Sequence, residues 1–142
     1  MINTFLEAND FSDETFKSVE LKSENLSNRH FENCLFENCS LPASSLRGSS
    51  FFECTFINCD LSNIQVTGAK FREIKFVNCK LMGIKWASAT TLAQVKFHKC
   101  LLNYSVFEGI DLRKSIFEDC VAREVDFSSC NLSESILCGS DF

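Results

Sequence analysis

A large apolar side chain recurs every five residues along almost the whole chain. Stepping by five from Leu6 gives leucine, phenylalanine, valine or tryptophan at every position up to Trp86. The register then slips by one residue within residues 87–91 and resumes from Leu92 to Phe142, with Ala122 as the one small residue in this second run. A period of five fits neither the 3.6 residues of an α-helix nor the two residues of a flat strand. The chain must therefore coil in another geometry.

Small residues lie two positions before each apolar centre. From residue 34 onwards these positions hold only cysteine, serine, alanine, threonine, valine or isoleucine, and every cysteine except Cys138 lies in one of them. Cysteine works well as a small buried hydrophobic residue. A straight ladder of thiols about 4.8 Å apart does not provide the tetrahedral thiolates that zinc requires, and nine cysteines cannot close a complete disulfide framework. We interpret them as packing residues and expect no metal and no cofactor.

A longer period, four times the first, underlies the period of five. The strings FENC (36–39), FINC (56–59), FVNC (76–79), FHKC (97–100) and FEDC (117–120) follow one another at intervals of four five-residue units, with one extra residue across the slip. Four such units per turn indicate a four-sided coil, and like residues stacked coil on coil are typical of a solenoid. The pattern predicts about seven coils. The predicted interior ladder consists of Phe36, Phe56, Phe76, Phe97, Phe117, Cys39, Cys59, Cys79, Cys100 and Cys120.

The two ends of this predicted tube differ. Glu14, Glu24 and Arg29 occupy small-residue positions near the start, and charged groups are not buried without partners. We therefore divide the single domain into an irregular capping coil, residues 1–30, and a regular β-helix, residues 31–142. At the other end we expect an open apolar edge, which favours association, and hence a homodimer joined through the C-terminal coil. The predicted dimer residues are Phe127, Leu132, Leu137 and Phe142.

The net charge of −5 hides three bands of opposite sign. Residues 1–60 hold 10 acidic and 4 basic residues, residues 61–100 hold 1 and 7, and residues 101–142 hold 8 and 3. Five lysines of the basic band each precede an apolar centre and are expected to ring the tube. They are Lys70, Lys75, Lys80, Lys85 and Lys96.

The start of the chain lacks the apolar run of a signal peptide, and no stretch reaches the roughly 20 apolar residues of a membrane span. We therefore expect a cytoplasmic protein without a membrane partner.

Several units are similar to a known repeat motif. CDLSN (59–63), IDLRK (110–114) and CNLSE (130–134) resemble the motif of the pentapeptide-repeat family. The resemblance implies an all-β fold, a right-handed quadrilateral parallel β-helix. The FENC blocks and the stretch CKLMGIKW (79–86) look most like the Qnr-type quinolone-resistance branch. That branch implies a DNA mimic that engages DNA gyrase or topoisomerase IV. Acidic residues would carry this contact, and the candidates are Glu32, Glu37, Glu53, Asp60, Glu118, Asp119, Glu124 and Glu134.

The sequence offers no pattern typical of an enzyme. His30 and His98 flank apolar centres without an obvious nucleophile beside them, and we interpret the pair Glu118–Asp119 as a solvated face. The alternative to the gyrase hypothesis is a general protein–protein scaffold with a different partner, for which Met82 and Tyr104 are exposed candidates. Direct binding of nucleic acid is disfavoured, because the lysine ring makes a diffuse field rather than a stripe.

Overall fold

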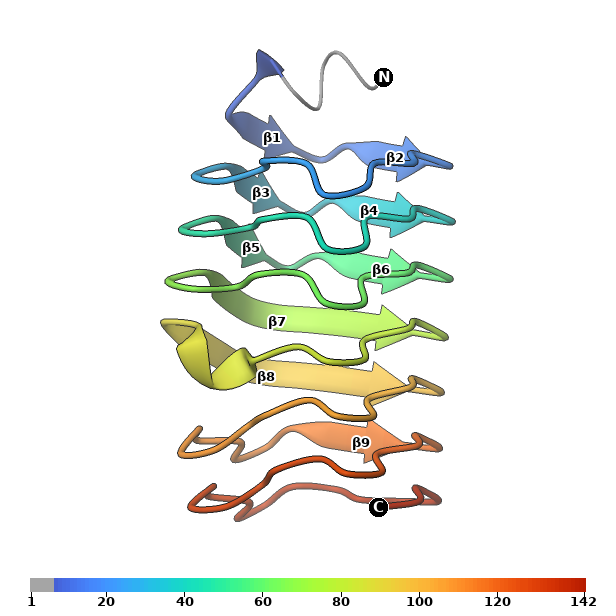
Figure 1. The fold of residues 1–142 in the computed structure, drawn as a ribbon, viewed down its shortest axis with the longest axis vertical. Coiled ribbons are helices and arrows are strands. Elements are labelled where there is room, and N and C mark those ends of the chain that lie inside the picture. The colour runs from blue at the N-terminus through green and yellow to red at the C-terminus, as the bar shows by residue number, and fades with distance from the viewer. Residues whose placement is uncertain (1–6) are drawn as a thin grey trace.

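The computed structural model describes residues 7–142, so the first predicted centre, Leu6, lies outside the described residues. The chain winds through a stack of similar coils, from β1 at the top of the view to the C-terminus at the bottom (Figure 1). The strands are β1 (Asp10–Ser12), β2 (Thr15–Lys17), β3 (His30–Glu32), β4 (Leu35–Glu37), β5 (Ser50–Phe52), β6 (Thr55–Ile57), β7 (Lys70–Val77), β8 (Thr91–His98) and β9 (Ile116–Glu118), with a 3₁₀ helix, η1 (Trp86–Ser88), between β7 and β8. The predicted all-β parallel solenoid is confirmed.

Each strand pairs in parallel with the strand one coil away. Phe11 pairs with Phe31, Phe31 with Phe51, and Phe51 with Phe71, so the register step equals four five-residue units, as predicted. Strands on both of two adjacent sides cover about five turns, from β1 and β2 to the long β8, rather than the seven coils predicted. Beyond them the coils pair through β9 and through isolated parallel bridges such as Ile116 to Ile136, like the bridges that join coils elsewhere along the tube, for example Ser40 to Asp60.

The one-residue slip predicted within residues 87–91 is absorbed at a corner of the tube. The chain makes the short η1 there, and the Ala69 carbonyl accepts hydrogen bonds from both Thr90 N–H at 2.8 Å and Thr91 N–H at 3.3 Å. Two residues thus oppose one, as in a β-bulge. The register between β7 and β8 includes the extra residue, since Lys70 pairs with Thr91. β8 therefore still lies parallel to β7, one coil further along the tube.

The interior is a set of vertical stacks of like side chains. Phe36, Phe56 and Phe76 stack with ring centroids 4.5 and 5.1 Å apart and with nearly parallel planes. Trp86 is fully buried and meets the edges of Phe71 and Phe76. All ten predicted ladder residues are buried. Burial contributes about 1.5–3 kcal/mol for each large apolar side chain, so these stacks are the main source of stability.

The buried cysteines also act as hydrogen-bond donors. The Cys79 thiol donates to the Phe56 carbonyl at 3.3 Å, and the Cys59 thiol donates to the Phe36 carbonyl at 3.4 Å. Ser49 and Ser105 occupy equivalent positions and donate to Leu26 and Leu81 at 2.8 Å. Where serine or cysteine occupies this position, the side chain is small enough for the interior and its donor is satisfied by a carbonyl on the preceding coil. Burial raises the pKa of Cys54 to about 12, so its thiol stays protonated and keeps its donor proton.

Corners of the tube use a left-handed backbone conformation. The residue two positions after an apolar centre has a positive φ at corner after corner, for example Asn38 (56°), Asn58 (54°) and Asn78 (52°). Asparagine tolerates this conformation better than most residues. At Gly83, with φ 69°, an added Cβ would lie 2.2 Å from Asn63 Oδ1 on the preceding coil. Corner side chains therefore reach along the tube towards the next coil.

The regular register extends into the region predicted to form the cap. β1 and β2 pair with β3 and β4, and Phe11, Phe16 and Leu26 are buried, so the backbone shows no break near residue 30. Glu14 and Glu24 are exposed, in accord with their charge. The division at residue 30 remains a prediction based on side-chain type. Among the described residues, no helix is both long and apolar enough to cross a membrane.

Candidate interaction surface

The coil register converts sequence position into height along the tube. Because each residue pairs with the residue one coil away, the three charge bands of the sequence become three slabs, acidic, basic and acidic from one end to the other. The same register stacks outward side chains in vertical columns. A residue has as its column neighbours the residues one coil before and one coil after it.

The eight predicted acidic residues are at least partly exposed, but they lie in several columns. Glu32 pairs with Ser12 and Phe52, and Asp60 lies between Ser40 and Lys80. Among the described residues, the predicted set therefore forms no continuous acidic column, because its acids do not recur once per coil. Glu118 and Asp119, adjacent in the chain, are the members of the set that lie together.

The acidic band at the start of the tube has carboxylates without ion-pair partners. Within the described part of the chain, Glu32, Glu37, Glu53 and Asp60 belong to none of the ion pairs. The ion pairs lie instead in and beside the second acidic band, where Asp111 pairs with Arg113 and Asp141 with Arg123. The first band therefore presents the more open negative charge.

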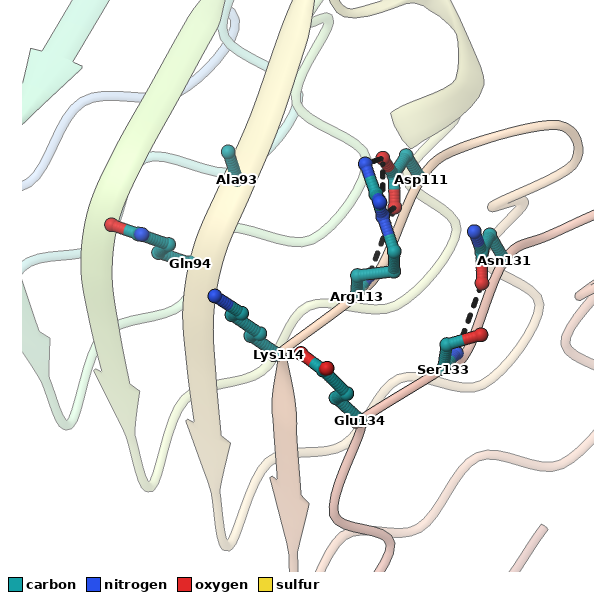
Figure 2. A pocket seen from close by; sticks show the side chains of 8 residues that line it. All are labelled: Ala93, Gln94, Asp111, Arg113, Lys114, Asn131, Ser133 and Glu134. Atoms are coloured by element: carbon teal, nitrogen blue, oxygen red, sulfur yellow. Dashed lines mark hydrogen bonds and ion pairs between the residues drawn. The ribbon is translucent and has the colours of Figure 1, made fainter.

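A shallow hollow of about 470 Å³ lies where β8 meets the second acidic band, and Ala93 and Gln94 of β8 form part of its lining (Figure 2). Arg113 Nη2 lies 2.7 Å from Asp111 Oδ2, and Arg113 Nε donates to Asp111 Oδ1 at 2.9 Å. The Arg113 guanidinium lowers the pKa of Asp111. Lys114 and Glu134 also line the hollow. Its lining contains no histidine, cysteine or tyrosine, and Asp111 is engaged by Arg113, which gives no arrangement typical of catalysis.

A groove of about 450 Å³ follows a ladder of asparagines at one corner. Asn38, Asn58 and Asn78 line it together with Asp60 and Lys80. Asn78 Nδ2 donates to Asn58 Oδ1 at 2.6 Å, so the ladder satisfies part of its own hydrogen-bonding capacity. Sequence reasoning did not identify this corner. The available signal is the asparagine that precedes each cysteine in FENC, FINC and FVNC, because it recurs once per coil.

The five lysines of the basic band lie at several positions around the tube. Lys75 pairs in register with Lys96, so two like charges are stacked, while Lys70 pairs with Thr91. Lys80 and Lys85 bridge to Leu101 and Val106. No lysine takes part in an ion pair within residues 7–142. The band is therefore an open, diffuse positive field.

The predicted dimer residues lie at the far end of the tube. Phe127 and Leu132 are half-buried, and Leu137 and Phe142 are exposed at 45% and 50%. Phe142 contacts the Phe127 ring with centroids 5.6 Å apart. The edges of these side chains are accessible as expected, and the dimer remains a prediction.

Comparison with solved structures gives several similar proteins. HetL, a pentapeptide repeat protein involved in heterocyst differentiation regulation from the cyanobacterium Nostoc sp. strain PCC 7120, is 14% identical over 99% of this chain and 92% of its own, with a TM-score of 0.45. Full-length QnrB1, a plasmid-mediated fluoroquinolone resistance protein, is 17% identical over 90% and 86%, with a TM-score of 0.33. Rfr23 from the cyanobacterium Cyanothece 51142 is 12% identical over 99% and 96%, with a TM-score of 0.30.

Comparison with curated protein sequences finds no match. Two family models do match. The model described as a pentapeptide repeat region matches residues 29–107, and the model described as pentapeptide repeats (8 copies) matches residues 105–142. The first of these alone covers more than half of the sequence, and the predicted resemblance is confirmed: this chain belongs to the pentapeptide-repeat family.

Proposed function

We propose that this protein is a non-enzymatic binding protein whose acidic first band engages the DNA-binding surface of a type II topoisomerase, DNA gyrase or topoisomerase IV. The observation that carries the proposal is the unpaired negative charge of that band on a rigid tube. Glu32 and Glu53 are exposed, and Glu37 and Asp60 are partly exposed, and none of the four is in an ion pair within the described residues. Protein surfaces that bind DNA are positively charged, so an acidic surface is attracted to them.

The slab arrangement explains why one band can act alone. The basic band spans about two coils, which is about 10 Å at 4.8 Å per coil. The Debye length at physiological ionic strength is about 8 Å. A partner bound at the first acidic band is therefore largely screened from the far acidic band and meets the lysines only at its edge. The tube acts as a local acidic contact rather than a uniformly charged rod.

A gyrase supercoiling assay tests this proposal. Purified protein is titrated into the reaction with and without ciprofloxacin, and we expect either inhibition of supercoiling or protection from the drug. The variant Glu32→Gln/Glu37→Gln/Glu53→Gln should need at least tenfold more protein for half the effect. The matched control Lys70→Gln/Lys75→Gln/Lys80→Gln removes three charges of the other sign and should act at least as well as the wild type. No effect of the wild type at micromolar excess would refute the proposal.

The alternative function is a general interaction scaffold with another protein partner. Tyr104 is 66% exposed and Leu101 is 36% exposed on one coil, with Met82 half-buried on the coil before. This apolar group supports a protein contact that depends on one side of the tube. A pull-down in which Tyr104→Ser loses a partner, while the triple glutamate variant keeps it, would favour the scaffold. We retain the homodimer through the C-terminal coil and the cytoplasmic location as parts of the proposal.

A further inference from the structure

One imidazole and two carboxylates meet where two consecutive coils stack. His98 ends β8 and Glu118 ends β9, and the strand register pairs these two residues directly. Asp119 follows at the corner. One ligand atom from each of the three side chains lies within 4.8 Å of the others. This cluster lies outside the acidic first band, and the proposed function does not use it.

His98 and Glu118 form a short contact, which is an ion pair when the imidazole is protonated. His98 Nδ1 lies 2.6 Å from Glu118 Oε1, yet this nitrogen atom is buried and has no hydrogen-bond partner among the described residues. The oxygen therefore lies away from the direction in which a proton on Nδ1 would point. The two atoms form an ion pair when the imidazole is protonated, and they are neighbouring metal-ligand atoms when it is neutral.

Asp119 is held in position by the geometry of the corner. Its φ is 55°, and its side chain reaches towards the next coil, where a Cβ on Gly139 would lie 2.2 Å from Asp119 Oδ1. Gly139 therefore leaves the space that the carboxylate occupies. Within residues 7–142, neither Asp119 nor Glu118 forms an ion pair with a lysine or arginine, although Lys99 lies at the same corner one coil earlier. Glu118 therefore has His98 as its ion-pair partner, and Asp119 has none among the described residues.

We propose that His98, Glu118 and Asp119 form a binding site for one divalent transition-metal ion of the zinc type. Zinc binds imidazole nitrogen and carboxylate oxygen at about 2.0–2.2 Å, which places tetrahedral ligand atoms about 3.3–3.6 Å apart. The side chains of His98 and Glu118 are 26% and 35% exposed, so small rotations bring the ligands to this spacing. The imidazole selects Zn²⁺, Co²⁺ or Ni²⁺ over Mg²⁺ and Ca²⁺, which favour oxygen ligands alone.

The site would join two coils and would leave one coordination position open. His98 belongs to one coil and the two acids belong to the next, so an ion bound to all three stabilises the folded tube by mass action. The fourth position faces outward and takes water or a side chain of a partner. The ion would also offset two of the negative charges of the second acidic band.

Isothermal titration calorimetry with Zn²⁺ tests the site. The protein carries Cys138→Ser, because this exposed free thiol lies one coil beyond Glu118 and could bind zinc by itself. We expect one Zn²⁺ per chain. Binding should weaken at least tenfold in His98→Ala and in Asp119→Asn. The matched control is His30→Ala, because His30 is an exposed histidine at a strand position far along the tube.

A second readout separates loss of the site from loss of the fold. Thermal melts in EDTA should show each variant folded, and added Zn²⁺ should raise the Tm of the Cys138→Ser protein by several degrees but not that of its His98→Ala derivative. Co²⁺ should give the visible absorption of a tetrahedral complex in the same pattern. Three results would overturn the proposal: no stoichiometric binding, equal binding after His98→Ala, or binding that requires Cys138.

Discussion

Ser105 and Ser115 occupy equivalent buried positions but differ in hydrogen bonding. Each lies two residues before an apolar centre, and each is fully buried. Ser105 Oγ donates to the Leu81 carbonyl at 2.8 Å and accepts from Ile84 N–H at 3.2 Å. Ser115 Oγ has no hydrogen-bond partner among the described residues. The same substitution to alanine should therefore change stability in opposite directions at these two positions.

The expected magnitudes follow from the cost of unsatisfied buried polar groups. Ser105→Ala leaves the Leu81 carbonyl and the Ile84 N–H without this partner, and such a loss costs about 1–3 kcal/mol. Ser115→Ala removes a hydroxyl that is buried without compensation, which relieves a penalty of about 1–3 kcal/mol, less a small loss of packing. We expect Ser105→Ala to destabilise the protein by about 2 kcal/mol and Ser115→Ala to stabilise it by about 1 kcal/mol.

Urea unfolding monitored by tryptophan fluorescence measures both changes. Trp86 is the single tryptophan and is fully buried in the middle of the tube, so its emission reports unfolding of the core. The midpoint urea concentration should fall for Ser105→Ala and rise for Ser115→Ala, with the m-value unchanged. If both variants are destabilised equally, side-chain volume rather than hydrogen bonding decides what this position accepts, and the reasoning fails.

Three further predictions concern the core, the far end and one carboxyl group. Phe76→Ala should destabilise the protein by about 3–5 kcal/mol, because Phe76 is fully buried in the phenylalanine stack, and a melt shift no larger than that of exposed Lys75→Ala would contradict the register. Sedimentation equilibrium should give a dimer that Leu137→Asp dissociates, whereas a monomeric wild type at tens of micromolar would rule out the end-to-end contact. Hydrogen bonds from Ser128 lower the pKa of Asp126, so their stabilising effect is present above the ordinary carboxyl pKa and is lost as the pH falls through the lowered value. An NMR titration should show this pKa rising in Ser128→Ala, and an unchanged value would refute the assignment of the cause.

The interior of the tube could be predicted because each inward position recurs once per coil with the same type of residue. Phe36, Phe56 and Phe76 recur at the step of one coil, and the parallel register brings these like residues into contact. The number of turns built from regular strands was not predicted, because the apolar period is the same where the coils pair through strands and where they pair through isolated bridges.

The role of cysteine was predicted in part. Its small size and burial followed from its spacing, but its donation to a backbone carbonyl on the preceding coil did not. The Cys79 thiol, for example, donates to the Phe56 carbonyl. The residue type at position 56 does not reveal that this carbonyl faces the thiol, because the backbone geometry of the coil determines it. The occurrence of serine as well as cysteine at this position was the available signal, because these two residues share small size and a donor.

The proximity of His98 to Glu118 could have been predicted by aligning successive repeats. FHKC (97–100) and FEDC (117–120) place histidine above glutamate and lysine above aspartate. Along the chain the neighbour of Glu118 is Asp119, whereas across coils it is His98, and only the alignment of repeats displays the second relation. In a solenoid the lateral neighbour is the residue one period away, so surface chemistry has to be read in columns.

The outward columns also show where the fold leaves the choice of residue free. Lys75 pairs with Lys96, and Glu73 lies one coil after Glu53 in the register that pairs β5 with β7. Like charges directly opposite each other in a sheet are destabilising, and the buried stacks do not require either residue type at these positions. Such pairs cost stability in the isolated protein and would gain most from a partner of opposite charge. The triple glutamate and triple lysine variants of the supercoiling assay therefore also affect stability. Each removes one charge from a like-charged pair, Glu53 from Glu53–Glu73 or Lys75 from Lys75–Lys96, and should raise the free energy of unfolding. The same change should weaken any contact that the removed charge makes with a partner.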